Sequence, residues 1–193
     1  MDSFDLQIRS LVKCLSAQKI KYVIIGGIAV SIYGMPRLTL DIDVNIILDK
    51  EKINEFLQRA KKYGLYPAPP NSKKIAQTTG VIPLKFKKQK VFGQVDIIIA
   101  ENLLEYSAIE RGRIKKIGSI MVRVISPEDL VIHKIASLRA RDREDLQGIL
   151  MRQRQRLNLG YIRGCLKKID KANRGSGLYK LFCRLLEELR VKT

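Results

Sequence analysis

Histidine, paired cysteine and long apolar segments are scarce in this sequence of 193 residues. Because His133 is the only histidine, a metal site built from imidazoles is excluded. The cysteines Cys14, Cys165 and Cys183 are odd in number and never form a C-x-x-C pair, which favours reduced thiols over a disulfide framework or a zinc site. The longest uncharged run, residues 22–36, is interrupted by glycine and is shorter than the ~20 residues of a membrane span. We therefore expect a soluble, cytoplasmic protein without a membrane partner.

Acidic residues are also few, since 19 aspartates and glutamates stand against 37 lysines and arginines, giving a formal net charge of +18. The excess is uneven: residues 1–110 hold 16 basic and 11 acidic side chains, whereas residues 111–193 hold 21 and 8. Such an excess has to meet anions, and nucleic acid is the first partner to consider. The alternative is a basic, well-solvated surface.

Residues 22–48 form the stretch around which the rest of the chain is organised. A short apolar strand is expected at its start, and the pair Gly26-Gly27 ends that strand before a short helix of small residues. A second strand carries Asp41 and Asp43, which share one face because side chains two residues apart in a strand point the same way. Two like charges on an apolar strand repel each other, and a hard cation with oxygen ligands cancels this repulsion. The stretch therefore predicts a metal site with carboxylate ligands.

Apolar spacing and turn residues predict the remaining elements. In the first part of the chain we expect helices at residues 2–19, 50–63 and 101–110, a loop at 66–74, and hairpins joining 80–86 to 91–99 and 113–117 to 120–125. Ser126 as the N-cap and Pro127 in the first turn begin a series of helices. These helices are expected at about residues 127–138, 142–155, 159–172 and 178–191. The pattern predicts an α/β (α+β) core domain with a mixed sheet, residues 1–125, and a basic C-terminal helical region, residues 126–193.

A third acid, Asp96, lies on the predicted strand 91–99. If this strand neighbours the strand of Asp41 and Asp43, three carboxylates converge at one edge of the sheet. Such a cluster is typical of sites that hold two Mg²⁺ ions ~3.5–4 Å apart, one activating a hydroxyl and one holding a triphosphate. Backbone N–H groups after the glycine pair can approach phosphates at the helix N-terminus. The alternatives are plain surface acids on an edge strand and, for Asp96, a strand-end cap.

Three segments carry a resemblance to a known group of proteins: GGIAVSIYGMPRLTLDIDV, QVDIII and SPEDLVIHKIASLRARDREDL. Together they resemble the nucleotidyltransferase superfamily that includes DNA polymerase β. Among its small prokaryotic members they look most like the AbiEii-type toxins of toxin–antitoxin pairs. The likeness covers roughly residues 20–150. It implies a polymerase-β-like fold, a metal cofactor (two Mg²⁺ ions, with Mn²⁺ as the alternative), and an NTP such as ATP as the substrate.

The resemblance also implies roles for individual residues. Asp41, Asp43 and Asp96 would be the catalytic residues and the metal ligands, and Asp96 would also act as the base. The glycine pair would bind the triphosphate, but the family often has serine at the second position, where Gly27 supplies no hydroxyl. Lys134 and an R-D-x-x-D element that ends at Asp145 match a segment that closes the site. The residues expected to bind the nucleotide are Gly26, Gly27, Arg37, Thr39, Lys134 and Asp145. The alternatives are a helix-surface lysine at Lys134, dipole-favoured helix acids at Asp142 and Asp145, and ordinary turn and strand residues at Arg37 and Thr39.

The expected activity is transfer of an NMP from an NTP to a hydroxyl. The net charge favours an RNA acceptor, such as a tRNA 3′ end, bound through the basic C-terminal region. The resemblance adds a role as a toxin with an acidic antitoxin as partner. The alternatives are transfer to a protein side chain, and a non-catalytic module that binds RNA or a partner on the same fold. An antibiotic acceptor is disfavoured, because cationic antibiotics are attracted to an acidic groove.

Overall fold

The computed structural model describes residues 3–39, 41–137, 139–173 and 175–191; Asp2, Leu40 and Leu138, which the predictions placed in elements, lie outside these ranges. The chain divides into two compact units, and each is described on its own. The sheet unit contains residues 1–28 and 38–125, and the helical unit contains residues 29–37 and 126–193. These units differ from the predicted domains in the placement of residues 29–37.

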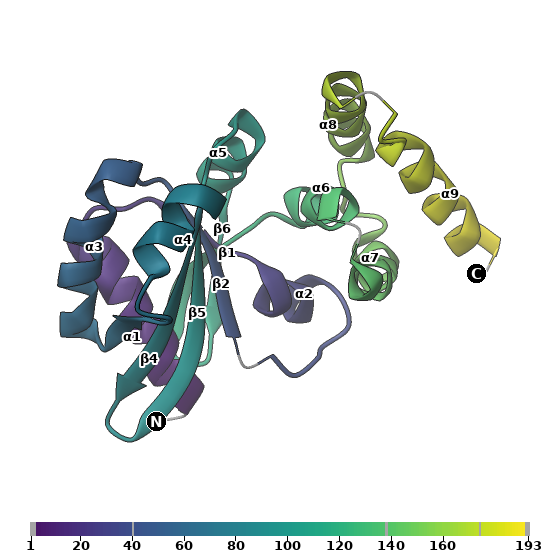
Figure 1. Cartoon of the computed structure of the whole chain (residues 1–193). Coiled ribbons are helices and arrows are strands. Elements are labelled where there is room, and N and C mark those ends of the chain that lie inside the picture. Colours follow the sequence, from purple (N-terminus) through teal and green to yellow (C-terminus); the bar gives the residue numbers. More distant parts are fainter. Residues whose placement is uncertain (1–2, 40, 138, 174, 192–193) are drawn as a thin grey trace. The chain divides into compact units, whose positions relative to one another are not determined.

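In the described residues, the sheet unit is built on one seven-stranded mixed sheet (Figure 1). Across the sheet the strands are β3 (Leu65–Pro67), β4 (Val81–Lys88), β5 (Val91–Ile99), β2 (Asp41–Ile46), β1 (Tyr22–Ile24), β7 (Ile120–Val124) and β6 (Arg113–Ile117). Strand β2 runs parallel to β5, and β1 runs parallel to β7, whereas the other neighbours are antiparallel. The mixed sheet with its helices confirms the predicted fold class, and both predicted hairpins are present as β4–β5 and β6–β7.

One face of the central strands is closed by helices. Helices α1 (Ser3–Ala17) and α3 (Ile53–Ala60) lie on one side of the sheet (Figure 1). The amide of Gln7 in α1 lies so close to Gly93 of β5 that a Cβ on this glycine would overlap it. On this side the alternating residues of β2 and β5 are fully buried, namely Ile42, Val44, Val95 and Ile97. Because strand side chains alternate, the residues between them face the other side of the sheet.

The other elements of the sheet unit are α4 (Ser72–Thr79), α5 (Leu103–Glu110), and the short 3₁₀ helices η1 (Lys50–Lys52) and η2 (Lys61–Tyr63), which flank α3. The single helix predicted at residues 50–63 is thus divided into three, and Gly64 ends it in a left-handed conformation with φ of 81°. The predicted loop at residues 66–74 is confirmed only for residues 68–71. Its prolines hid the short strand β3, which pairs Leu65 with Phe86, and α4, which begins at Ser72. The Ser72 hydroxyl fixes that start by donating to the carbonyl of Pro83 at 2.9 Å.

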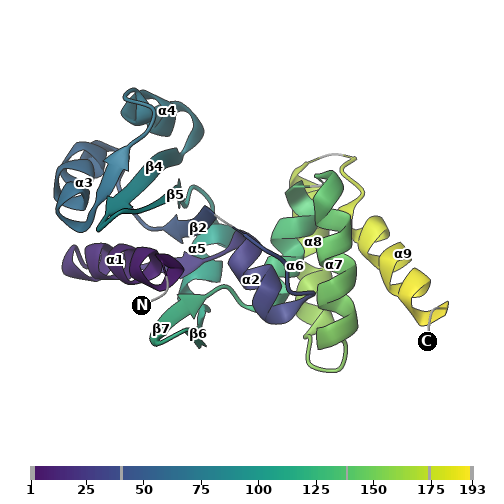
Figure 2. The ribbon, with the colours of Figure 1, turned by 90° about the horizontal axis from the view of Figure 1, so that it is seen from below.

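The helical unit consists of the C-terminal part of α2 (Gly26–Tyr33), α6 (Pro127–Ser137), α7 (Ala140–Gln153), α8 (Leu159–Ala172) and α9 (Leu178–Val191) (Figure 2). The prediction that Ser126 is the N-cap of α6 is confirmed, because the backbone N–H of Asp129 donates to its hydroxyl at 3.1 Å. Ile149, Leu166 and Phe182, from three different helices, are fully buried and form the apolar centre of this unit. Among the described helices, none combines the length and the apolar character that a membrane span requires.

Candidate active site

Three aspartates share one face of the sheet, and we name Asp41, Asp43 and Asp96 the carboxylate row. The parallel register of β2 and β5 places Asp43 directly beside Asp96, and Asp41 beside Gln94. Neighbours in register point to the same side, so all three side chains lie on the face opposite α1. The expectation that the two strands are neighbours is confirmed. The expectation that the acids meet at a sheet edge is wrong, because β2 and β5 are inner strands of the sheet and Asp96 lies in the middle of β5.

The first residue of α2 lies directly against the carboxylate row. Gly26 has φ of +61°, in the left-handed region that favours glycine. A Cβ on Gly26 would also overlap the carboxylate of Asp43. Glycine at this position therefore lets the chain turn from β1 into α2 while Asp43 sits beside the helix N-terminus. The first residue of the glycine pair and Asp43 are thus direct neighbours in space.

The second glycine makes room for Thr39. An ideal Cβ on Gly27 would lie 2.7 Å from the hydroxyl oxygen of Thr39 and 2.8 Å from its Cβ. The Thr39 hydroxyl also donates to the backbone carbonyl of Asp41 at 3.3 Å. A hydroxyl is therefore present beside the glycine pair although residue 27 itself carries none. From the sequence, Gly27 could be interpreted only as the loss of a serine hydroxyl. Nothing in the spacing of the residues indicates that Thr39 fills the same space.

Two acids of the carboxylate row, Asp41 and Asp96, lie close enough for the charge of one to affect the other. Within the described residues, no ion pair is found for Asp41 or Asp96. Burial raises the pKa of Asp96 above its ordinary value, and the negative charge of Asp41 raises it further. Both effects mean that the row would be more stable with a positive charge or a proton beside it.

The donor chemistry of the carboxylate row fits a hard divalent cation, which prefers carboxylate oxygens. A closed cage is not preformed: in the described parts of the chain, no three His, Cys, Asp or Glu side chains converge closely enough to hold a metal ion. A cation would therefore have to draw these side chains together. The metal-binding and catalytic roles of the three aspartates stay predictions.

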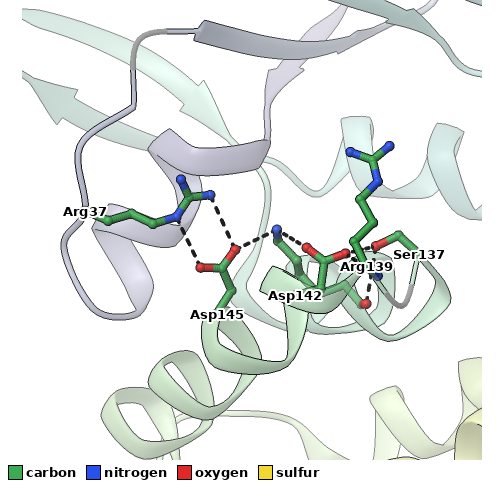
Figure 3. Close-up of polar contacts among 6 residues, drawn as sticks. Arg37, Ser137, Arg139, Asp142 and Asp145 are labelled. Carbon is green, nitrogen blue, oxygen red and sulfur yellow. Dashed lines mark hydrogen bonds and ion pairs between the residues drawn. The ribbon is translucent and has the colours of Figure 1, made fainter.

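A second group of charged residues lies within the helical unit and is internally paired (Figure 3). We name Arg37, Lys134, Asp142 and Asp145 the paired-charge network. The Lys134 ammonium donates to Asp142 Oδ1 at 2.5 Å and to Asp145 Oδ2 at 2.8 Å. Arg37 donates from Nε to Asp145 Oδ1 at 3.2 Å and from Nη2 to Oδ2 at 3.4 Å. Two cations and two anions thus balance each other.

Local contacts hold this network in place. The hydroxyl of Ser137 and the backbone N–H of Arg139 both donate to Oδ2 of Asp142. Burial alone would raise the pKa of Asp142, but hydrogen bonds from Lys134 and Ser137, the Lys134 charge and the Arg139 N–H outweigh it and hold that pKa below its ordinary value. On the other side, the Ser31 hydroxyl donates to the carbonyl of Arg37 at 3.0 Å.

The paired-charge network contains three of the residues that were expected to bind the nucleotide, namely Arg37, Lys134 and Asp145. In this structure Arg37 and Lys134 both form ion pairs with Asp145, which gives the three residues a structural role. Contact with a nucleotide stays a prediction for all three. The pair of Arg37 with Asp145 was missed because 108 residues separate them and no local pattern relates them.

Comparisons with solved structures find proteins of similar fold. The antibiotic-resistance factor ANT(2'')-Ia has a TM-score of 0.54 and 13% identity, over 89% of this chain and 96% of that chain. An antigenic nucleotidyltransferase-like protein from Paracoccidioides brasiliensis has a TM-score of 0.46 and 16% identity, over 91% of both chains. The lincosamide antibiotic adenylyltransferase LnuA, bound to lincomycin, has a TM-score of 0.43 and 16% identity, over 74% of this chain and 93% of that chain.

None of the curated proteins compared with the chain matches it. A family model described as "nucleotidyltransferase of unknown function (DUF6036)" matches residues 5–171. This range includes the carboxylate row, the glycine pair and the paired-charge network. The protein therefore belongs to the DUF6036 family of nucleotidyltransferases.

Proposed function

We propose that the protein transfers an NMP from an NTP to a hydroxyl at the 3′ end of an RNA, with a divalent cation, Mg²⁺ or Mn²⁺, as cofactor. The observation that carries the proposal is the carboxylate row, in which three aspartates from two adjacent strands share one face beside the N-terminus of α2. Nucleotidyl transfer needs this combination, because the triphosphate is anionic and its reaction is helped mainly by positioning and by neutralising charge.

Different residues of the sheet unit bind the phosphates and the cation in the proposed reaction. Backbone N–H groups at the start of α2 bind phosphate oxygens, and the glycine pair places no side chain of its own in the way. The Thr39 hydroxyl, beside Gly27, adds a donor for the same phosphates. Asp41, Asp43 and Asp96 hold the cation, which when bound supplies positive charge to the triphosphate and the attacking oxygen.

The bond changes follow from this placement. The acceptor oxygen forms a bond to the α-phosphorus, while the bond from that phosphorus to the oxygen bridging it to the β-phosphate breaks and pyrophosphate leaves. The acceptor hydroxyl loses its proton to Asp96. Without the cation, burial and the charge of Asp41 raise the pKa of Asp96. A bound cation would act in the opposite direction and keep this carboxylate ionised, the form that accepts a proton.

The RNA acceptor is supported by the net charge of +18, which attracts polyanions and disfavours cationic small molecules. The resemblance to AbiEii-type toxins supports a tRNA 3′ end as the acceptor and an acidic antitoxin as partner. Transfer to a protein side chain uses the same site and differs only in the acceptor. The experiment below therefore offers both acceptors to the enzyme.

The test is a transfer assay with α-labelled NTPs, total RNA or total protein, and Mg²⁺, Mn²⁺ or a chelator. We expect the wild type to label RNA when Mg²⁺ or Mn²⁺ is present and not when the chelator is present. We expect at least about 100-fold less with Asp41→Asn or Asp43→Asn, because each removes several kcal/mol of charge stabilisation. Asp49→Asn is the matched control, since Asp49 is an exposed acid that forms an ion pair with the exposed Lys52. Equal labelling by wild type and Asp43→Asn would contradict the proposal. If protein were labelled and RNA were not, the acceptor would be a protein side chain and not RNA.

A further inference from the structure

The face that carries the carboxylate row continues along β5 and β4 toward their turn. Asp96, Gln94 and Phe92 alternate along β5 and therefore share this face. Lys87 is the cross-strand partner of Phe92, and Lys85 is the partner of Gln94. Because paired residues of antiparallel strands point to the same side, these two lysines lie on the face of Asp96.

Strand β3 adds an aromatic ring to the same face. Tyr66 is the cross-strand partner of Lys85, so its ring lies on the side of Lys85 and Gln94. Tyr66 is 41% exposed and Phe92 is 69% exposed. Helix α1 covers the opposite face of β5 at Gly93. The two rings are therefore open to solvent on the side where the carboxylate row lies.

The turn between β4 and β5 brings positively charged side chains next to these rings. Gln89 and Lys90 form a two-residue turn with φ of 49° and 62°. Tyr66, Phe92, Gln89 and three lysines, Lys87, Lys88 and Lys90, line a hollow of about 620 Å³. The Lys87 ammonium lies 5.8 Å from the centre of the Phe92 ring. Residues 81–95 contain four lysines and no acidic residue.

We propose that this surface, the aromatic–lysine platform formed by Tyr66, Lys85, Lys87, Lys88, Lys90 and Phe92, binds the single-stranded RNA segment that precedes the accepting 3′ hydroxyl. Exposed rings that offer a face to bases, among lysines that meet phosphates, are the combination by which proteins hold single strands. Phe92 precedes Asp96 by four positions on β5, which is roughly 13 Å along a strand. An RNA stacked on the rings thus has its end within a few nucleotides of the carboxylate row.

The platform differs from the RNA surface expected from sequence, which was the basic C-terminal region. Charge counting favoured residues 111–193 because they hold the larger excess. The platform combines charge with exposed aromatic rings and shares a strand with Asp96, which the count could not indicate. The proposal rests on RNA being the acceptor in the proposed function.

Binding is measured first, by anisotropy of a labelled single-stranded RNA without metal or NTP, so that it does not depend on catalysis. We expect Phe92→Ala and Tyr66→Ala each to weaken binding roughly 5- to 150-fold, the range for losing a stacked base. Phe92→Tyr should bind like the wild type, and Phe92→Leu should not, because it keeps an apolar side chain but loses the ring. Tyr106→Ala, which removes a 39% exposed ring from α5, is the matched control.

The lysines are tested through the salt dependence of binding. Lys85→Ala with Lys87→Ala should reduce the slope of log K against log salt by roughly 1.4, since each phosphate contact to a single strand contributes about 0.7. Lys115→Ala with Lys116→Ala removes the same charge from the β6–β7 hairpin and should leave the slope nearly unchanged. An equal loss of slope in both pairs would overturn the platform in favour of a diffuse basic surface.

Transfer kinetics then separate this proposal from the proposed function. Phe92→Ala should raise KM for RNA and leave KM for the NTP unchanged. Transfer to RNA that neither Phe92→Ala nor Tyr66→Ala impairs would overturn the platform and leave the function standing. RNA binding that Phe92→Ala weakens, in a protein that transfers nothing to RNA, would support the platform and contradict the function.

Discussion

The carboxylate row and the paired-charge network are both built from aspartates, yet the protein treats them in opposite ways. In the network every carboxylate meets a cation, and the pKa of Asp142 is held below its ordinary value. In the row the acids lie beside each other, and the pKa of Asp96 is raised by burial and by Asp41. Charges that a protein pairs internally serve its stability, whereas neighbouring like charges such as those of Asp41 and Asp96 favour a cation from outside. The difference separates a structural cluster from a candidate catalytic one.

The sharpest test of this comparison removes the cation of the network. Lys134→Met leaves two buried carboxylates without their shared ammonium, and breaking a buried pair in this way typically costs about 3–5 kcal/mol. We expect a loss of this size in the free energy of unfolding, measured by urea denaturation. Lys21→Met is the control, because its ion pair with Glu110 is exposed and such pairs contribute about 0–1 kcal/mol. If Lys134→Met instead had normal stability and no longer bound NTP, Lys134 would be a nucleotide contact. The structural role assigned to the paired-charge network would then be contradicted.

A smaller effect is expected for Asp142→Asn, with a clear dependence on pH. The pKa of Asp142 is lower in the folded than in the unfolded protein, so its stabilising contribution is present above its ordinary pKa and is lost as pH falls toward the lowered one. At neutral pH we expect a loss of about 1.5–3 kcal/mol, typical of hydrogen bonds to a charged group. Urea unfolding at decreasing pH should show the difference from wild type shrinking in acid. A difference that is constant with pH would mean that the carboxylate charge is not what the network uses.

The glycine pair offers a test on the side of the carboxylate row. Gly27→Ser introduces a Cβ 2.7 Å from the Thr39 hydroxyl oxygen, and overpacking of this kind costs about 1–3 kcal/mol. Thr39→Gly removes the clashing atoms, so the double variant should recover part of this loss. Thermal unfolding of the wild type, both single variants and the double variant gives the coupling energy, which we expect to exceed about 0.5 kcal/mol. Additive losses would show that Thr39 does not occupy the space of a residue 27 side chain.

Periodicity and turn chemistry predicted most of the fold because they report local structure. The helices expected at residues 159–172 and 178–191 have the same bounds as α8 and α9. The alternation of Asp41, Ile42 and Asp43 fixed which residues face the core. The short strand β3 escaped because its residues fall among prolines, and its partner is contributed by β4, about twenty residues later.

The candidate site was predictable where one strand or one turn carries it, and not where distant segments meet. Asp41, Asp43 and the glycine pair are close in sequence, and their relation to Asp96 needed only that β2 and β5 be neighbours. The pairing of Arg37 with Asp145 and the filling of space at Gly27 by Thr39 depend on tertiary packing. The platform could be predicted only in part. The lysines at residues 87–90 are evident from the sequence, but the exposure of Phe92 and Tyr66 on the face of Asp96 is not.

The smallest expected effect has the opposite sign to all the others. Asp96→Asn removes a partly buried carboxylate whose ionised form is disfavoured, so the variant should be more stable than the wild type at neutral pH, by about 1 kcal/mol or less. The gain should vanish in acid, because the raised pKa means that the folded wild type already holds the proton there.

Thermal unfolding with and without Mg²⁺ completes this test. Binding to the folded state alone stabilises the wild type, so adding Mg²⁺ should raise its unfolding midpoint and close the gap to Asp96→Asn, which lacks one of the three expected ligands. A residue that lowers the stability of the empty protein and is needed for the ion is the mark of a site selected for function rather than for folding. If Asp96→Asn instead unfolds at a lower temperature than the wild type, Asp96 belongs with Asp142 as a structural acid, and the contrast between the two clusters disappears.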